Sequence, residues 1–432
     1  MTLFSAPHLQ LSFSAGLVLV SRLGGAAATV LILYILTQNL SPEEVGIIIA
    51  SQAVGALAGL ALTFNMEGAA IRFLPSYQRN APDHIWGFLH KISRTAFMMS
   101  PFAIIIAPLY LLLATDLPPT AYLPLLFIAL MPLGSALLRS TSLISHSLGQ
   151  IQQSAFSLMG LRPLLLLFSL GVIASLGMMS VEMGLAASVF ALAGAASYQL
   201  FFLKTVLPAR PKPPLPPNAE WQRTGLVLML TVLFIDEFPN LVSLLASATL
   251  GEDDVAILAI ALRVALLLRM ITAATTMVIS PKLSAHIGEG EWRPATQLTH
   301  QMVRLSALSI GGGSFILYLF TPFILSFFGS AYEEGVTILR LLILIPLISA
   351  FFGPSLMILT AAGQTKIIFN TTAFALILLS FGTLISSPFG VMGVTLTLIS
   401  IHLLWETSLF VAVWRQGFRP WLPHAILSLR KP

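Results

Sequence analysis

Long apolar stretches dominate the chain and alternate with short polar segments. A helix needs about 20 apolar residues to cross a bilayer, and windows of that length predict twelve spans. These cover residues 13–37, 45–64, 96–114, 121–143, 154–177, 183–207, 223–249, 255–280, 302–324, 337–361, 367–386 and 391–414. Barrel strands would instead alternate over about ten residues. The pattern therefore predicts an all-α polytopic membrane protein with twelve transmembrane helices.

The composition excludes a water-soluble globule. Of 432 residues, 56% are apolar and only 9% are charged, against roughly 25% charged in an ordinary soluble domain. The mean hydropathy is +0.90. The chain has no Cys, which excludes disulfides, Cys-ligated zinc and thiol nucleophiles. The net charge of +5 matters through its placement along the chain, and we expect no nucleic-acid partner.

Charge differs in sign between the two sets of predicted loops. The loops after even-numbered spans, with the tail, hold 17 of the 22 basic residues: Arg72, Arg79, Lys91, Arg94, Arg139, Lys204, Arg210, Lys212, Arg223, Lys282, Arg293, Arg304, Lys366, Arg415, Arg419, Arg430 and Lys431. The loops after odd-numbered spans have no Lys or Arg and carry Glu43, Glu44, Asp116, Glu182, Glu252, Asp253, Asp254, Glu333 and Glu334. The positive-inside rule then places both termini in the cytoplasm.

The chain also contains an internal repeat. Residues 40–47 align with 250–257, and the same offset of 210 pairs His90 with His300 and Arg94 with Arg304. This predicts two six-helix bundles related by an axis along the membrane normal, around a central cavity. The expected division is an N-terminal bundle (1–207), a Pro-rich cytoplasmic linker (208–222), a C-terminal bundle (223–414) and a cytoplasmic tail (415–432).

Two parallel-related bundles favour transport by alternating access, whereas enzyme signatures are missing from the sequence. There is no Walker loop, no Gly-x-Ser-x-Gly and no His-Glu-x-x-His, so we expect no catalytic residue, no metal and no cofactor. The eight His residues lie mostly in predicted loops and never cluster at ligand spacing. Solvated or capping roles are expected for them.

Charged residues inside the predicted spans carry the most chemical information, because each is unfavourable in lipid unless it faces water or a partner. Arg22, Arg162, Arg263 and Arg269 are candidates for a cationic clamp on an anionic group, since guanidinium binds phosphate through two parallel bonds. Snorkelling or ion pairing between helices is the alternative. That alternative is favoured for Arg340, which lies near a membrane interface.

Asp236 and Glu237 lie near the middle of the seventh predicted span, and Pro239 follows. A proline removes a backbone donor and kinks a helix, so these three residues are candidates for an ion-coupling or gating element. A salt bridge from the two acids to Arg263 or Arg269 is the alternative. The third intramembrane acid is Glu406, in the twelfth span.

Several stretches resemble one family. Leu40-Ser41-Pro42-Glu43-Glu44-Val45-Gly46, and the Arg-Phe-x-Pro-x-Tyr pattern within Gly68–Tyr77, resemble the polysaccharide-transport branch (O-antigen and exopolysaccharide flippases, Wzx-like) of the multidrug/oligosaccharidyl-lipid/polysaccharide (MOP) exporter superfamily. The segments Phe327–Tyr332 and Leu137–Leu164 are likewise similar to its connections.

This resemblance implies a flippase in the bacterial inner membrane that moves an undecaprenyl-pyrophosphate-linked oligosaccharide by alternating access, with membrane lipids and a polysaccharide polymerase as further partners. An ion-coupled multidrug or toxin extruder of the same superfamily is the alternative. Intramembrane charges, five basic against three acidic, favour an anionic substrate. A membrane glycan polymerase or ligase is less favoured, because the predicted outer loops are short.

Overall fold

The computed structural model describes residues 7–115, 122–208, 219–270 and 291–417, with residues 279, 283, 285–287 and 289 between the last two ranges. Every regular element in these ranges is helical, and none is a strand. The expected positions of Asp116, Arg210, Lys212 and Lys282, and most of the predicted linker and tail, lie outside them.

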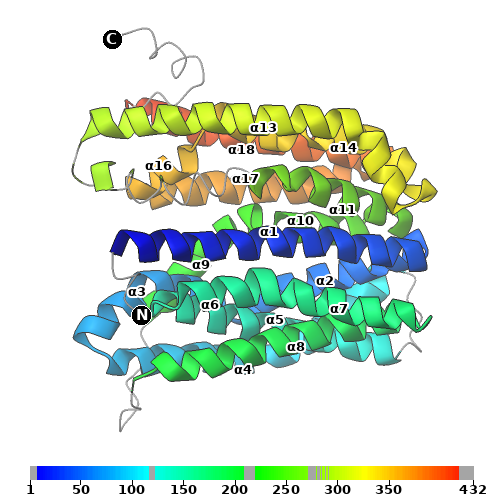
Figure 1. The fold of residues 1–432 in the computed structure, drawn as a ribbon, viewed down its shortest axis with the longest axis horizontal. Helices are drawn as coiled ribbons and strands as arrows, with labels where there is room; N and C mark the ends of the chain where they lie inside the picture. The colour runs from blue at the N-terminus through cyan, green and yellow to red at the C-terminus, as the bar shows by residue number, and fades with distance from the viewer. Residues whose placement is uncertain are drawn as a thin grey trace. The chain divides into compact units, whose positions relative to one another are not determined.

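Figure 1 labels most of the described helices. In chain order they are α1 (Pro7–Asn39), α2 (Pro42–Leu62), α3 (Met66–Asn80), α4 (Asp83–Ala114), α5 (Tyr122–Ser147), α6 (Ile151–Ala155), the π-helix η1 (Phe156–Leu161), α7 (Arg162–Ser175), α8 (Val181–Val206), α9 (Ala219–Ile235), α10 (Phe238–Ser247), α11 (Glu252–Leu266), α13 (Trp292–Phe328), η2 (Ser330–Gly335), α14 (Val336–Leu342), α15 (Leu344–Phe352), α16 (Ser355–Ala361), α17 (Thr365–Ser386), η3 (Ser387–Phe389) and α18 (Gly390–Arg415).

The expected all-helical membrane fold is confirmed. Nine helical stretches of the described part are long and apolar enough to cross a membrane, and the bent pair α9 and α10 adds a tenth. The stretch Thr365–Arg415 contains two helices, α17 and α18. The eighth predicted span, 255–280, runs from α11 into residues outside the described ranges. The tenth, 337–361, is divided into α14, α15 and α16.

The chain divides by its contacts into a first unit, Met1–Asp253, and a second unit, Asp254–Pro432. Helices α9 and α10 belong to the first unit because α9 packs on α3 and α10 packs on α2. Trp221 of α9 shows the reason, since it is 1% exposed and packs edge-to-face on Phe88 while its Nε1 donates to the Tyr77 hydroxyl at 2.9 Å. This boundary lies after the expected linker. The expected two-bundle duplication remains a prediction.

In the first unit, α5 is the central helix and packs against α2, α3, α4 and α8, while α1 packs on η1 and α7. The segment Gly68–Tyr77 forms most of α3, an amphipathic helix that was not expected as a separate element. It turns Ala70 and Leu74 inward and leaves Ile71 and Arg72 exposed. The inner residues join one apolar core with residues from four other helices: Met66, Ala70, Leu74, Ile85, Phe88, Ile92, Ile144, Leu148, Leu203 and Trp221.

In the second unit, α18 packs along α17, as Figure 1 shows, and also contacts α14, α15 and α16. Helix α13 packs on α14 and α15. Between α15 and α16 the chain breaks at Gly353, which has a φ of 74°, and at Pro354. Glycine adopts that backbone conformation without steric penalty, and proline cannot continue the hydrogen-bond ladder.

Candidate functional site

The helix pair α9 and α10 is broken at Asp236–Glu237. Pro239 has no amide hydrogen for the carbonyl of Ile235, four residues earlier, and the helix axes differ by 76°. The amides of Asp236 and Glu237 both donate to the Val232 carbonyl at 2.9 Å, which closes α9. The break turns Glu237 toward the protein and leaves Asp236 exposed.

Three charged side chains meet at this break, and we call them the Arg139 cluster: Glu67, Arg139 and Glu237. Arg139 of α5 places Nε 3.2 Å from Glu67 Oε1 and Nη1 3.2 Å from Glu237 Oε1. The Glu67 side chain is 0% exposed, and the other two are 15% exposed. Asn240 Nδ2 donates to the second oxygen of Glu237 at 2.8 Å. One guanidinium therefore links α3, α5 and the start of α10.

Glu67 is held inside by the turn between α2 and α3. Phe64 and Asn65 have φ values of 50° and 51°, a left-handed conformation that is strained for a bulky residue such as Phe. Gly225 of α9 lies against this turn, where a Cβ atom would come within 2.6 Å of the Phe64 carbonyl oxygen. The turn starts α3 so that Glu67 in its first turn points at Arg139.

Burial and charge act in opposite directions on this carboxyl, which lies outside the apolar spans. Burial raises the pKa of Glu67 above its ordinary value, and the positive charge of Arg139 lowers that pKa by a smaller amount. A buried carboxylate without a counter-charge would be strongly unfavourable. Arg139 is therefore the counter-charge that the buried Glu67 carboxylate needs when it is ionised.

The sequence reasoning placed Arg139 wrongly and did not single out Glu67. Arg139 was expected in a cytoplasmic loop, but it lies inside α5, eight residues before the helix ends at Ser147. Its position within the span predicted for 121–143 was the available signal. Glu67 follows a long apolar run and directly precedes the Gly68–Tyr77 pattern, and nothing else in the sequence marks it. Within the first unit, Glu237 pairs with Arg139.

Arg162 begins α7 directly after the π-helical turn, and its charge interacts with that of Glu237. Pro163 follows, so the carbonyl of Met159 lacks the donor that an α-helix would offer. The wider turn results, and the Arg162 amide bonds to the Ser157 carbonyl five residues back. π-helical turns of this kind are frequent at functional sites.

Helix α1 docks on the same turn. A Cβ on Gly25 would overlap the freed Met159 carbonyl oxygen, so only glycine permits this approach. Three residues earlier, Arg22 Nε donates to the Met159 sulfur at 3.2 Å. The described residues place no carboxylate oxygen within 4.0 Å of Arg22. The first unit thus holds two of the four clamp candidates beside one π-turn.

The other clamp candidates belong to the second unit. Arg263 in α11 donates from Nη1 to the Ala259 carbonyl at 3.3 Å. Arg269 interacts electrostatically with His402 and Glu406. Arg340 stacks its guanidinium over the Tyr318 ring, 4.7 Å from the ring centre. A clamp made of Arg22, Arg162 and one of Arg263 or Arg269 remains a prediction.

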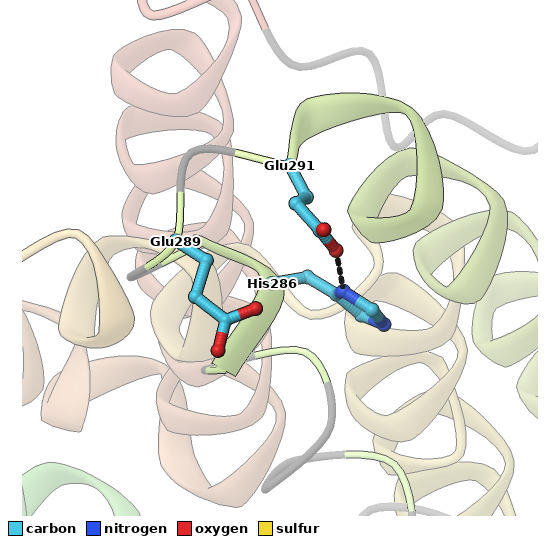
Figure 2. A group of neighbouring side chains, drawn as sticks. All are labelled: His286, Glu289 and Glu291. Atoms are coloured by element: carbon cyan, nitrogen blue, oxygen red, sulfur yellow. Dashed lines mark hydrogen bonds and ion pairs between the residues drawn. The ribbon is translucent and has the colours of Figure 1, made fainter.

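Among the described histidines, two depart from the expected solvated or capping roles: His402, and His300, which is 8% exposed inside α13. His402 lies inside α18 and is 3% exposed, so its expected solvated or capping role is wrong. His286, Glu289 and Glu291 have ligand atoms within 4.8 Å of one another. In Figure 2 the His286 ring faces Glu291, with 2.6 Å between Nδ1 and Oε2. Because these side chains are exposed or half-exposed, this group is an ordinary solvated hydrogen bond between His286 and Glu291 with a second acid nearby.

Comparisons with known proteins agree with the fold. The MatE family matches residues 228–385. An inward-facing multidrug resistance MATE family transporter of the MOP superfamily has a TM-score of 0.63 at 14% identity, covering 93% of each chain. A MATE in complex with MaD5 has a TM-score of 0.63 at 17% identity, covering 93% of this chain and 96% of that one.

A third similar structure is a MOP superfamily transporter from Pyrococcus furiosus, described with the statement that the reverse polarity of its binding pocket suggests a different function. Its TM-score is 0.62 at 15% identity, covering 93% of this chain and 95% of that chain. No curated protein sequence matches. The chain therefore has the fold of MATE transporters of the MOP superfamily, and its residues 228–385 match the MatE family.

Proposed function

We propose that this chain is an ion-coupled exporter of the MATE type, which moves an amphipathic organic solute across the bacterial inner membrane. The single observation that carries this proposal is the Arg139 cluster at the break between α9 and α10. The fold and the MatE match over residues 228–385 support transport over catalysis. The loop charges predict that both termini are cytoplasmic.

The cluster suits a moving part because its charges depend on one another. Arg139 forms ion pairs with Glu67 and Glu237 at 3.2 Å each, so any motion of α10 against α5 must separate an ion pair or carry it along. A solute or ion that replaces one partner of Arg139 would favour one arrangement over the other. Such differential contacts are what a population shift requires. Helix α10 is therefore the proposed gating element, with Glu237 and Pro239 at its start.

The similar solved structures include a multidrug resistance MATE transporter, which favours a multidrug or toxin substrate for this chain. The three residues of the Arg139 cluster by themselves carry a net negative charge when both carboxylates are ionised, and the charge of Arg162 also acts on Glu237. A negative, partly apolar site attracts organic cations.

A second candidate is the flipping of an undecaprenyl-pyrophosphate-linked oligosaccharide. The specific observation in its favour is Arg22, whose Nε donates to the uncharged Met159 sulfur and whose positive charge is thus available to a phosphate. The Gly68–Tyr77 pattern, which resembles the polysaccharide-transport branch, points the same way. A polysaccharide polymerase would then be a partner.

Reconstitution into liposomes separates the two candidates. We expect a proton or sodium gradient to drive accumulation of a fluorescent organic cation, and Arg139→Gln to abolish it. Arg72→Gln is the matched control, because Arg72 and its partner Glu220 are 67% and 55% exposed. No cation transport by the unmodified chain would contradict the proposal.

The same liposomes test the second candidate with a fluorescent prenyl-pyrophosphate oligosaccharide. If the second candidate is correct, the label crosses the bilayer and Arg22→Ala stops it while protein levels stay normal. Arg22→Lys should restore only part of the rate, because Lys lacks the planar fork. Unchanged flipping by Arg22→Ala and Arg162→Ala would remove the clamp hypothesis.

A further inference from the structure

The second unit buries a separate group of ionisable side chains, which we call the His402 cluster: Ser349, His402 and Glu406. His402 and Glu406 lie one turn apart on α18 and are 3% and 6% exposed. Ser349 of α15 bridges them, with its Oγ 2.9 Å from His402 Nε2 and 2.7 Å from Glu406 Oε1. The two ionisable atoms themselves are 3.8 Å apart.

The bonding pattern fixes the direction of each hydrogen bond when Glu406 is ionised. A carboxylate only accepts, so the single Ser349 hydrogen must point to Glu406. The Ser349 oxygen then accepts from His402 Nε2–H, which assigns the tautomer from the network. The result is a directed chain from His402 through Ser349 to Glu406.

The surroundings of this chain contain few other charges. Arg269 interacts electrostatically with both His402 and Glu406. Among the helices packed on α18, α14 contributes Arg340, which lies over Tyr318, and α17 contributes only Lys366, which is exposed. α15, α16 and η3 have no charged residue, and Arg415 at the end of α18 is exposed. Glu406 is thus the one carboxylate inside the packed part of α18, in the described ranges.

Ser349 connects this chain to a helix break. It lies in the last turn of α15, and its carbonyl accepts the amide of Gly353 at 3.0 Å. Gly353 has a φ of 74°, and Pro354 follows. A change in how Ser349 bonds therefore acts on the turn where α15 ends and α16 begins.

We propose that Ser349, His402 and Glu406 form a proton-binding site in the second unit. Glu406 takes up one proton and changes from a carboxylate to a carboxylic acid, so the charge of the cluster rises by one. The Glu406 hydroxyl then donates to Ser349, whose own hydrogen turns to the carbonyl one turn earlier, a common acceptor for helical serines. This deepens the proposed function, on which it rests, by naming the proton as the coupling ion.

Infrared difference spectroscopy tests the site without any transported substrate. The purified full chain is titrated between about pH 5 and pH 8, a range in which His changes charge and which buried carboxyl groups can reach. We expect the carbonyl band of a buried carboxylic acid to appear on acidification and to be lost in Glu406→Gln. The exposed Glu334→Gln is the control and should keep the band. Because the buried Glu67 can give a similar band, the measurement is made in a Glu67→Gln background, where a band that survives in Glu406→Gln would overturn the proposal.

Ser349→Ala provides a second, milder variant, since it removes only the bridging hydroxyl. It should keep the band and shift both its frequency and its midpoint, and an unshifted band would contradict the bridge. The outcomes also separate the two proposals. A titrating Glu406 band without transport of either substrate would leave the proton site standing and remove the proposed function. Transport whose pH dependence is unchanged in Glu406→Gln would leave the proposed function standing and remove the proton site.

Discussion

The two units bury different kinds of charge beside their helix breaks. In the Arg139 cluster a permanent cation lies 3.2 Å from each of two carboxylates, at the 76° bend between α9 and α10. In the His402 cluster the carboxylate contacts a neutral hydroxyl at 2.7 Å, near the break at Gly353. Guanidinium stays charged at all relevant pH values, whereas His and Glu can gain or lose protons.

This difference suggests different tasks for the two clusters. The Arg139 cluster joins three helices through fixed charge, so it responds when a partner is displaced. The His402 cluster changes its charge by gaining or losing a proton, without the displacement of a partner, so it responds to pH. Substitutions that exchange or remove these properties should separate the two tasks.

The largest expected effect comes from removing the permanent cation. Arg139→Gln leaves Glu67 buried without its counter-charge and leaves Glu237 with Arg162 alone, and breaking a buried ion pair costs about 3–5 kcal/mol. We expect a large fall in thermal unfolding temperature in detergent, while Arg72→Gln loses at most about 1 kcal/mol, as exposed pairs do. The double variant Arg139→Gln with Glu67→Gln should recover part of the loss. Equal stability of Arg139→Gln and the parent would show that the cluster carries no charge.

The next effect tests how α1 and the π-turn support Arg22 and Arg162. Gly25→Ala would push a methyl group into the Met159 carbonyl, and overpacking of this kind costs about 1–3 kcal/mol. Gly24→Ala is a matched control, because nothing lies within 4 Å of its Cβ position. We expect only Gly25→Ala to lower the unfolding temperature. Equal behaviour of the two variants would contradict the docking of α1 on this turn.

The smallest effect concerns the pH dependence of stability. Burial raises the pKa of Glu67 in the folded chain above its ordinary value of 4.5, so folding favours the protonated form. The stabilisation is complete below about pH 4.5 and is lost as pH rises through the folded pKa. Glu67→Gln should flatten this slope in unfolding temperature measured against pH. A slope that is steeper in the variant would show that Arg139 outweighs burial.

The sequence predicted the helical membrane class well because lipid imposes long apolar runs, which are read directly. It also located the helix break, since Pro239 acts locally on its own backbone. The pairing of Glu237 with Arg139 was not predicted, because pairing depends on which helices pack together and the following span offered Arg263 and Arg269 as nearer candidates in the sequence. Glu67 comes from α3 and Arg139 from α5. Arg139 lies 98 residues before Glu237 in the chain.

The role of His402 was also beyond what the sequence could predict. His402 and Glu406 are four residues apart in an apolar helix, a spacing that places them on one face. The spacing of His402 and Glu406 could be seen in the sequence. Ser349, however, is 53 residues from His402, and nothing distinguishes it from the other serines of the apolar segments. The contact that gives the pair its chemistry was therefore invisible before the fold was known.

The most direct test of the division between the two clusters is the pH dependence of transport in liposomes. If one proton is coupled to transport, each pH unit across the membrane changes the proton concentration ratio that drives transport about tenfold. We expect transport by the parent chain to follow this ratio. We predict that Glu406→Gln loses the pH dependence, whereas Glu67→Gln is slower and keeps it. A pH dependence that persists in Glu406→Gln and disappears in Glu67→Gln would contradict the account.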